Sequence, residues 1–436
     1  MTKSILRSRL LQLAVLSLVA LMIIGFAFAS QNISPNATGK VRDEYVAVKP
    51  SFGGEGYDQF YPQTLVVEQG DQVNLVIRNT GGASFSLSIE NVTTTTIQPG
   101  FATASGTQPV DTKVPIFTTS TAGIFRFYAV EHPEMNGQLV VYPSDWSHYV
   151  PSQAERRFIL LSIPDFAGDG YDKFLPETIV VNQGDNVSLA VRNLDTAPHG
   201  FAMAAYGIDA AVNPAQELAN GTLTPSVTEV PTFIASSPGI FKFLCTVPCG
   251  PGHREMVGAM TVLPKGASGY RPDAITSYNY LVVKPDFAGE GYDKFLPGTI
   301  FVNQGDLVYI VVRNTDTMPH GLTFIGSDVN NETIAPATEN GNETVPVDTY
   351  LSPFFADRLG IYEFFCTTPC GPGHDQMIGN LVVLPRLSGE VPPLTSVSEE
   401  ADLEKLALVS FGLLVVGFVA GLVVMTKFGV QEKRRD

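Results

Sequence analysis

Three segments of this chain repeat one pattern at domain-sized intervals. They read GEGYDQFYPQTLVVEQGD, GDGYDKFLPETIVVNQGD and GEGYDKFLPGTIFVNQGD, and they begin at Gly54, Gly168 and Gly289. The offsets of 114 and 121 residues match a folded domain and exceed the period of a short solenoid repeat. The chain is therefore expected to contain three tandem domains, at 43–145, 152–265 and 275–386.

Within each copy, short runs rich in β-branched and aromatic residues predict strands. In the second copy these runs are TIVV, NVSLAVRN, GIFKFLC and GAMTVLP, and the tetrapeptide NQGD predicts a turn between the first two. Helical periodicity is sparse. The fold class is thus expected to be all-β, with each domain an antiparallel β-sandwich.

Two apolar runs lie outside the repeats. The first follows basic residues and ends in Ala27-Phe28-Ala29, so 1–30 is interpreted as a signal peptide or an uncleaved N-terminal anchor. The second, 406–426, carries no charge and is long enough for a transmembrane helix, after a polar linker at 387–405. The basic tail 427–436 is expected in the cytoplasm. The expected localisation is a single-pass protein of the cell membrane, with most of the chain extracytoplasmic.

The charge balance excludes one class of partner. The formal net charge is −16, which argues against nucleic acid and favours a basic protein partner. No nucleophile–base set or phosphate-binding loop stands out in the sequence, so catalysis by this chain alone has little support.

The second and third repeats each carry the run Cys-x3-Cys-x3-His-x2-Met. The two runs read CTVPCGPGHREM from Cys245 and CTTPCGPGHDQM from Cys366, and each follows an apolar strand. A further histidine, His199 or His320, stands 46 residues before the first cysteine in both copies. Equal spacing in two diverged copies indicates that one geometry is kept in both.

Copper is the metal that suits this donor set. All four cysteines of the chain lie in the two runs, together with thioether and imidazole donors. Copper accepts thiolate and methionine together, whereas zinc rarely takes a thioether. Two cysteines per set exceed what a mononuclear blue-copper site uses, which suggests sulfurs shared between two ions. A structural zinc site and a Cys-x3-Cys disulfide are the alternatives.

The pattern Cys-x3-Cys-x3-His-x2-Met with an upstream histidine resembles the CuA-type cupredoxin domain of cytochrome c oxidase subunit II and nitrous oxide reductase. The resemblance implies Greek-key β-sandwiches and two binuclear copper centres, each passing one electron at a time. It implies that two cysteines bridge the coppers, two histidines each bind one, and a methionine and a backbone carbonyl are weak ligands. The implied ligands are His199, Cys245, Val247, Cys249, His253 and Met256 in one repeat, and His320, Cys366, Thr368, Cys370, His374 and Met377 in the other.

The first repeat departs from this pattern. Phe85 stands where the other copies have His199 and His320, both cysteines are absent, and only His132 and Met135 remain as an H-x2-M pair. A structural or docking role is expected there. The aspartates of the GYDKF segments recur in all three copies, so Asp172 and Asp293 are interpreted as residues of the fold.

The expected function is electron transfer by a membrane-anchored chain with two CuA-type centres. The expected partners are a soluble cytochrome or small copper protein and a membrane oxidoreductase. The alternatives are a subunit II-like component of a terminal oxidase or nitrogen-oxide reductase, a copper storage or delivery protein, and an adhesive protein without metal. Val247 and Thr368 stand where subunit II has a glutamate, and the one tryptophan, Trp146, is expected in a linker.

Overall fold

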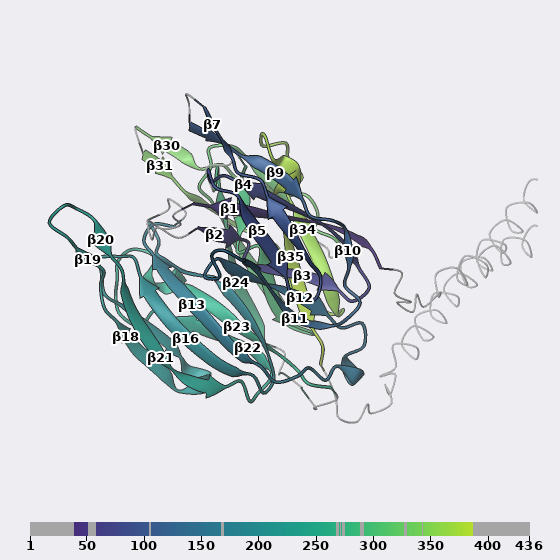
Figure 1. The fold of residues 1–436 in the computed structure, drawn as a ribbon. Helices are drawn as coiled ribbons and strands as arrows, with labels where there is room; N and C mark the ends of the chain where they lie inside the picture. Colours follow the sequence, from purple (N-terminus) through teal and green to yellow (C-terminus); the bar gives the residue numbers. More distant parts are fainter. Residues whose placement is uncertain are drawn as a thin grey trace, which may run out of the picture.

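A computed structural model describes residues 39–386, apart from 51–57, 104–105, 167–169, 267–269, 271, 273–274, 288–291, 327–328 and 342. Strands dominate this part of the chain, and its helical segments are 3-10 turns of three residues each. The all-β prediction is therefore confirmed (Figure 1). Each repeat forms two sheets of four or five strands that pack face to face, together with one separate two-stranded sheet.

The first repeat contributes the sheet β10-β4-β1-β2, with β9 on β4, and the sheet β3-β12-β11-β5-β6. Its strands are β1 Val41–Lys49, β2 Gln59–Tyr61, β3 Thr64–Glu68, β4 Gln72–Asn79, β5 Phe85–Ile89, β6 Thr93–Ile97, β7 Phe101–Thr103, β8 Gly106–Gln108, β9 Val110–Lys113, β10 Phe117–Thr118, β11 Gly123–Ala129 and β12 Asn136–Tyr142.

The second repeat forms the sheets β14-β13-β16-β21 and β15-β23-β22-β17-β18. Its strands are β13 Glu155–Ile163, β14 Lys173–Leu175, β15 Thr178–Asn182, β16 Asn186–Asn193, β17 His199–Met203, β18 Ile208–Val212, β19 Gln216–Glu217, β20 Leu223–Thr224, β21 Ser226–Ile234, β22 Gly239–Leu244 and β23 Val257–Leu263. The short helices are η2 Trp146–His148 before the repeat and η3 Ala204–Tyr206 and η4 His253–Glu255 within it.

The third repeat forms the sheet β25-β24-β27-β32, with β33 on β27, and the sheet β26-β35-β34-β28-β29. Its elements are β24 Thr276–Lys284, β25 Lys294–Leu296, β26 Thr299–Asn303, β27 Leu307–Asn314, β28 His320–Phe324, β29 Glu332–Ile334, β30 Thr338–Asn340, β31 Glu343–Val345, β32 Val347–Tyr350, β33 Phe354–Phe355, β34 Gly360–Phe365, η5 His374–Gln376 and β35 Ile378–Leu384.

The expectation of purely antiparallel sheets is wrong. Each sheet of the sandwiches contains one parallel pair, such as β13 with β16 and β15 with β23. The chain crosses between the two sheets of a repeat several times, so strands that pair as neighbours are separated by crossovers and can run in the same direction. The sandwich itself agrees with the sequence, because inward and outward positions alternate along β4, β16 and β27.

The repeated sequence motifs build the core and its turns. The phenylalanine of the GYDxF segment, Phe174 in the second repeat, is fully buried, with its ring centroid 5.9 Å from that of Phe243. In the NQGD turn, Gly184 has a positive φ of 97°, and the buried Asp185 side chain accepts backbone N–H groups of Asn182 and Ala154. The predicted turn is confirmed.

The three repeats pack around one another as a closed ring, in which each repeat contacts both of the others. Thr64 of the first repeat donates to the carbonyl of Thr178 in the second, and Thr178 donates to the carbonyl of Thr299 in the third. Lys49 of the first repeat donates to the carbonyl of Phe287 in the third at 2.9 Å. Two apolar clusters take residues from all three repeats, so every repeat contacts both of the others.

Trp146 belongs to one of these shared clusters. It is 5% exposed and makes edge contacts with Tyr142 and Tyr149. The segment after the first repeat is therefore a packed part of the ring, in contrast to the expected linker.

The membrane localisation expected from the sequence is corrected by the structure. In the part of the chain that the structure describes, no helix is long and apolar enough to cross a membrane. The single-pass localisation is therefore not supported. The segments on which it rested, 1–30 and 406–426, lie outside the described residues, as do the linker 387–405 and the tail 427–436.

Candidate metal centre

The cysteine–histidine loop of the second repeat joins two neighbouring strands. β22 ends at Leu244, Cys245 follows directly, and the loop passes through η4 before β23 begins at Val257. The backbone N–H of Cys245 donates to the carbonyl of Met256 at 3.1 Å and closes the base of the loop. A rigid strand pair thus holds both ends of the segment that carries the predicted ligands.

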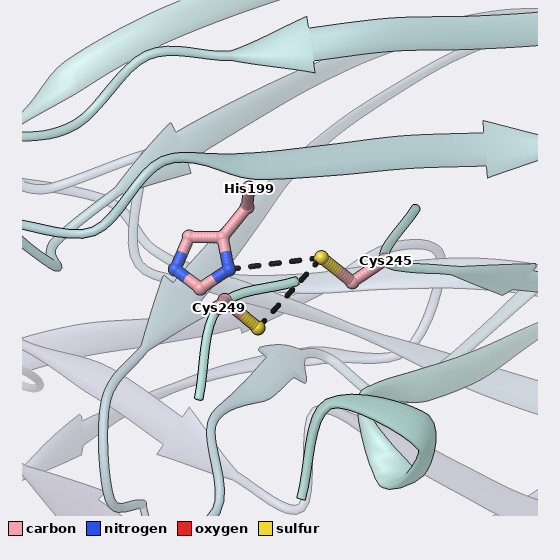
Figure 2. A group of neighbouring side chains, drawn as sticks. All are labelled: His199, Cys245 and Cys249. Carbon is pink, nitrogen blue, oxygen red and sulfur yellow. Dashed lines mark hydrogen bonds between the residues drawn. The ribbon is translucent and has the colours of Figure 1, made fainter. Parts of the chain in front are cut away.

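The side chains of this loop meet a histidine from another strand. His199 is the first residue of β17, and Figure 2 shows its ring beside the sulfurs of Cys245 and Cys249. Nδ1 of His199 lies 3.8 Å from Sγ of Cys245, and the two sulfurs lie 3.9 Å apart. On the other side, Nδ1 of His253 lies 3.5 Å from Sγ of Cys249.

The third repeat reproduces this geometry. Nδ1 of His320 lies 3.8 Å from Sγ of Cys366, and the sulfurs of Cys366 and Cys370 lie 3.9 Å apart. Nδ1 of His374 lies 3.5 Å from Sγ of Cys370. The equal spacing seen in sequence therefore corresponds to the same arrangement of side chains.

The sulfur–sulfur separation suits a metal ion shared by the two sulfurs and not a disulfide. All four cysteines are free thiols, and 3.9 Å is far beyond the S–S bond of about 2.05 Å. Two sulfurs bound to one ion at about 2.3 Å each can lie up to roughly 4.6 Å apart. The donor set of each repeat therefore fits an ion between the sulfurs and either histidine.

Backbone groups also approach the first cysteine of each pair. The N–H of Gly200 donates to Sγ of Cys245 at 3.4 Å, and the carbonyl of Val247 lies 3.1 Å from the same sulfur. A Cβ at Gly200 would collide with Thr246, so glycine is required for this close approach. In the third repeat Gly321 and Thr368 take these places, at 3.5 and 3.2 Å from Sγ of Cys366.

Met256 and Met377 have no exposed surface. Each lies in the same apolar cluster as the first cysteine of its repeat. His199 and His320 are also buried, whereas His253 and His374 are partly exposed. Each donor set thus has one side inside the sandwich and one side near its surface.

Sequence reasoning missed a carboxylate that contacts each buried histidine. Nε2 of His199 lies 3.1 Å from Asp195, and Nε2 of His320 lies 3.0 Å from Asp316. Such outer contacts orient a histidine ligand and select the nitrogen that faces the metal. The signal was present, because both aspartates stand four residues before their histidine, while Gly81 occupies the corresponding place in the first repeat.

Asp172 and Asp293 do more than support the fold. Asp172 accepts the backbone N–H of Asp165 in a turn, which agrees with its expected role in the fold. It also lies beside Asp195 and His199, and Asp293 lies in the same way beside Asp316 and His320. Each donor set therefore has a second carboxyl group beside it, and burial raises the pKa of both Asp172 and Asp293.

The two thiols of each pair differ in acidity. Burial raises the pKa of Cys245, but its hydrogen bonds with His199 and with the N–H of Gly200 outweigh the effect of burial and bring the value to about 7. For Cys249, burial and the neighbouring Cys245 raise the pKa to about 12. The same causes lower the pKa of Cys366 and raise that of Cys370 to about 12. The first thiolate therefore forms readily, and the second requires a metal ion or another compensating charge.

The first repeat lacks this arrangement. Phe85 is the first residue of β5, the position of His199 in β17, and its side chain is buried. The His132 side chain is 66% exposed beside Glu134, whereas Met135 is buried in the core. The surviving H-x2-M pair therefore does not form a compact donor set.

No family model matches the chain. A stretch of 91 residues is 33% identical to nitrous-oxide reductase from Stutzerimonas stutzeri and covers 20% of this chain and 12% of that protein. A stretch of 85 residues is 40% identical to nitrous-oxide reductase from Ralstonia nicotianae, with 19% and 12% covered. This chain thus matches about an eighth of the length of these curated relatives.

Solved structures align over much of the chain, but with low sequence identity and low TM-scores. A copper-containing nitrite reductase from Thermus scotoductus covers 79% of this chain and 99% of its own, with 14% identity and a TM-score of 0.21. A multi-copper oxidase from Pseudomonas thermotolerans covers 79% of this chain and 100% of its own, with 14% identity and a TM-score of 0.22. TM-scores of this size do not establish a shared fold.

Proposed function

We propose that this chain is a copper redox protein that transfers electrons through two binuclear CuA-type centres, one in the second repeat and one in the third. The observation that carries the proposal is the pair of unbonded sulfurs, 3.9 Å apart in both repeats, with a histidine Nδ1 beside each sulfur. Sequence similarity to a segment of nitrous-oxide reductases supports a copper protein of the cupredoxin type.

In the second repeat Cys245 and Cys249 would bridge two copper ions, and His199 and His253 would each bind one. Met256 and the carbonyl of Val247 would be the weak ligands. In the third repeat the corresponding residues are Cys366, Cys370, His320, His374, Met377 and the carbonyl of Thr368. Bound copper supplies one-electron redox chemistry.

The protein's own part is to keep the ligands in place when the charge of the site changes. Strands hold both ends of the loop, Asp195 orients His199, and the apolar core around Met256 excludes water. A soluble redox protein, such as a cytochrome or small copper protein, would exchange electrons with the partly exposed histidine side. The net charge of −16 favours a basic partner.

Copper delivery is the competing function, and burial argues against it. Delivery requires ligands that an acceptor can reach, whereas His199 is 1% exposed and Cys245 is 3% exposed. Slow loss of copper to a chelator would agree with electron transfer, and fast, complete loss would favour delivery.

Copper analysis with electron paramagnetic resonance tests the proposal. The purified, loaded protein is expected to bind four coppers per chain and to show one electron shared between paired ions. Cys249→Ser should remove one pair and retain the other, and Cys370→Ser should do the converse. Signals from isolated ions only, or a cystine in each loop, would refute the binuclear assignment.

A further inference from the structure

A tyrosine of the GYDKF segment packs on the cysteine–histidine loop of the same repeat. The ring of Tyr171 lies directly against Gly252, so closely that a Cβ at Gly252 would fall 2.1 Å from the ring. Gly252 has a positive φ of 72° and immediately precedes His253. Tyr292 contacts Gly373 in the same way, next to His374. Each tyrosine ring therefore contacts the backbone next to a candidate histidine ligand, and a shift of the ring would allow that backbone to move.

An arginine of a neighbouring repeat covers each of these tyrosines. The guanidinium carbon of Arg313, in the third repeat, lies 4.1 Å from the ring centre of Tyr171 in the second. Arg78, in the first repeat, lies 4.0 Å from the ring centre of Tyr292 in the third. Both distances are within the range of a cation–π contact.

A carboxylate fixes each arginine from the adjacent strand. Asp348 accepts two hydrogen bonds from Arg313, at 2.7 and 3.0 Å, and the two residues are register partners of β27 and β32. Asp111 accepts from Arg78 at 3.0 Å, and these are register partners of β4 and β9. A guanidinium held in this way keeps its charge over the ring.

A second contact joins the same loops to the neighbouring repeat. The buried Lys173 donates to the carbonyl of Glu255, the last residue of η4, at 3.1 Å, and its ammonium lies 5.2 Å from the ring centre of Tyr280 in the third repeat. Lys294 donates in the same way to the carbonyl of Gln376, and lies 4.5 Å from the ring centre of Tyr45 in the first repeat.

The interface between the first and second repeats lacks two parts of this arrangement. The register partner of Arg192 is Val227, where Arg78 and Arg313 have an aspartate. Ile159 stands at the strand position of Tyr45 and Tyr280. At this interface the second repeat supplies the arginine, and its neighbour is the first repeat, which has no cysteines. Among the described residues, the aspartate and the tyrosine are thus found where the neighbouring repeat carries a candidate donor set.

We propose that each copper loop is positioned by the next repeat around the ring: Arg313 with Asp348 positions the loop of the second repeat, and Arg78 with Asp111 positions the loop of the third. The presence of copper in these loops rests on the proposed function, whereas the contacts between the repeats are observed in the structure. It gives the first repeat, which has no ligand set, a role in completing the centre of the third.

Pulsed alkylation of the metal-free, reduced protein tests this positioning without copper. Peptide mass spectrometry resolves the four cysteines separately in one sample. Arg78→Ala should speed alkylation of Cys370 by roughly five- to thirtyfold and leave Cys249 unchanged, because one cation–π contact with its ion pair is lost. Arg313→Ala should do the reverse. Arg192→Ala is the matched control and should change neither.

The loaded protein supplies the second readout. Arg78→Ala should alter the paramagnetic signal and the chelator resistance of the third-repeat pair only, and Arg78→Lys should restore part of each because the charge remains. Equal effects of all three arginine variants, or an effect of Arg78→Ala on Cys249, would overturn the proposal. If the wild type binds no copper but the alkylation pattern holds, the proposed function fails and the positioning stands.

Discussion

Nε2 of His199 lies 3.1 Å from a carboxylate oxygen of Asp195, which leaves Nδ1 directed at the cysteine sulfurs. The same pairing joins His320 to Asp316 in the third repeat. The carboxylate thereby selects which nitrogen of a buried histidine is presented to a metal ion.

Removing this carboxylate is expected to weaken one centre only. Asp195→Asn should lower the copper affinity of the second repeat about 10- to 100-fold, because the amide orients the imidazole less strongly and reduces its basicity. Competition with a chelator measures the affinity. Asp316→Asn is the matched variant and should affect the third repeat alone. Equal weakening of both centres by either variant would contradict this role.

Met256→Leu should change the properties of the copper site with little effect on the stability of the fold. The two side chains are similar in volume, so the core around this fully buried position should lose less than about 1.5 kcal/mol of unfolding free energy. Both coppers of the proposed pair should remain, with a changed reduction potential and absorption spectrum, because the proposed weak thioether ligand is lost. Loss of copper from the second repeat would show that the methionine is a principal ligand.

Loading with copper should release protons in a predictable way. In the metal-free protein the pKa of Cys245 is about 7 and that of Cys249 is about 12, so the pair of the second repeat carries about one thiolate at pH 8. Copper bound at both proposed cysteine ligands requires both thiolates, so loading of the second repeat should release about one thiol proton at pH 8, and nearly two below pH 6. Titration in weakly buffered solution at both values measures this difference. No change in release between them would contradict a lowered Cys245 pKa.

The lowered pKa of Cys245 also makes the free energy of unfolding depend on pH. The folded pKa of Cys245 lies below its ordinary value of 9.0, so its contribution to stability is present above pH 9 and is lost as the pH falls through about 7. The raised pKa of Cys249 acts oppositely, since it costs stability as the pH rises from 9 towards 12. Denaturant unfolding of the metal-free protein across pH 6–11, compared with Cys245→Ser, measures the first contribution.

His132→Ala should leave the copper content unchanged. The His132 side chain is 66% exposed, and the buried Phe85 occupies the position of the upstream histidine. Metal analysis of the loaded variant and the wild type tests this expectation, and a fall in copper per chain would reveal a third site.

Phe243→Ala should destabilise the second repeat by about 3–5 kcal/mol, because it opens a cavity among Phe174, Phe201 and the surrounding core. Phe355→Ala, at a side chain that is 67% exposed, is the control and should change stability by less than about 0.5 kcal/mol. The shift in the denaturation midpoint gives the comparison.

The sequence by itself determined the strands, the NQGD turn and the composition of each donor set. These features are local, since alternation along a strand and the spacing within a loop depend on residues close in the chain. Even the pairing of His199 with Cys245 could be inferred, because two copies with equal spacing imply a common geometry.

Only the tertiary structure decided the parallel strand pairs, the carboxylates beside the histidines, and the arginines that reach across the ring. Tyr171 and Arg313 are 142 positions apart in the sequence, and nothing local relates a guanidinium in one repeat to a ring in another. Their contact arises because three similar sandwiches share two apolar clusters, and burial of those clusters brings the edge of each repeat against the next.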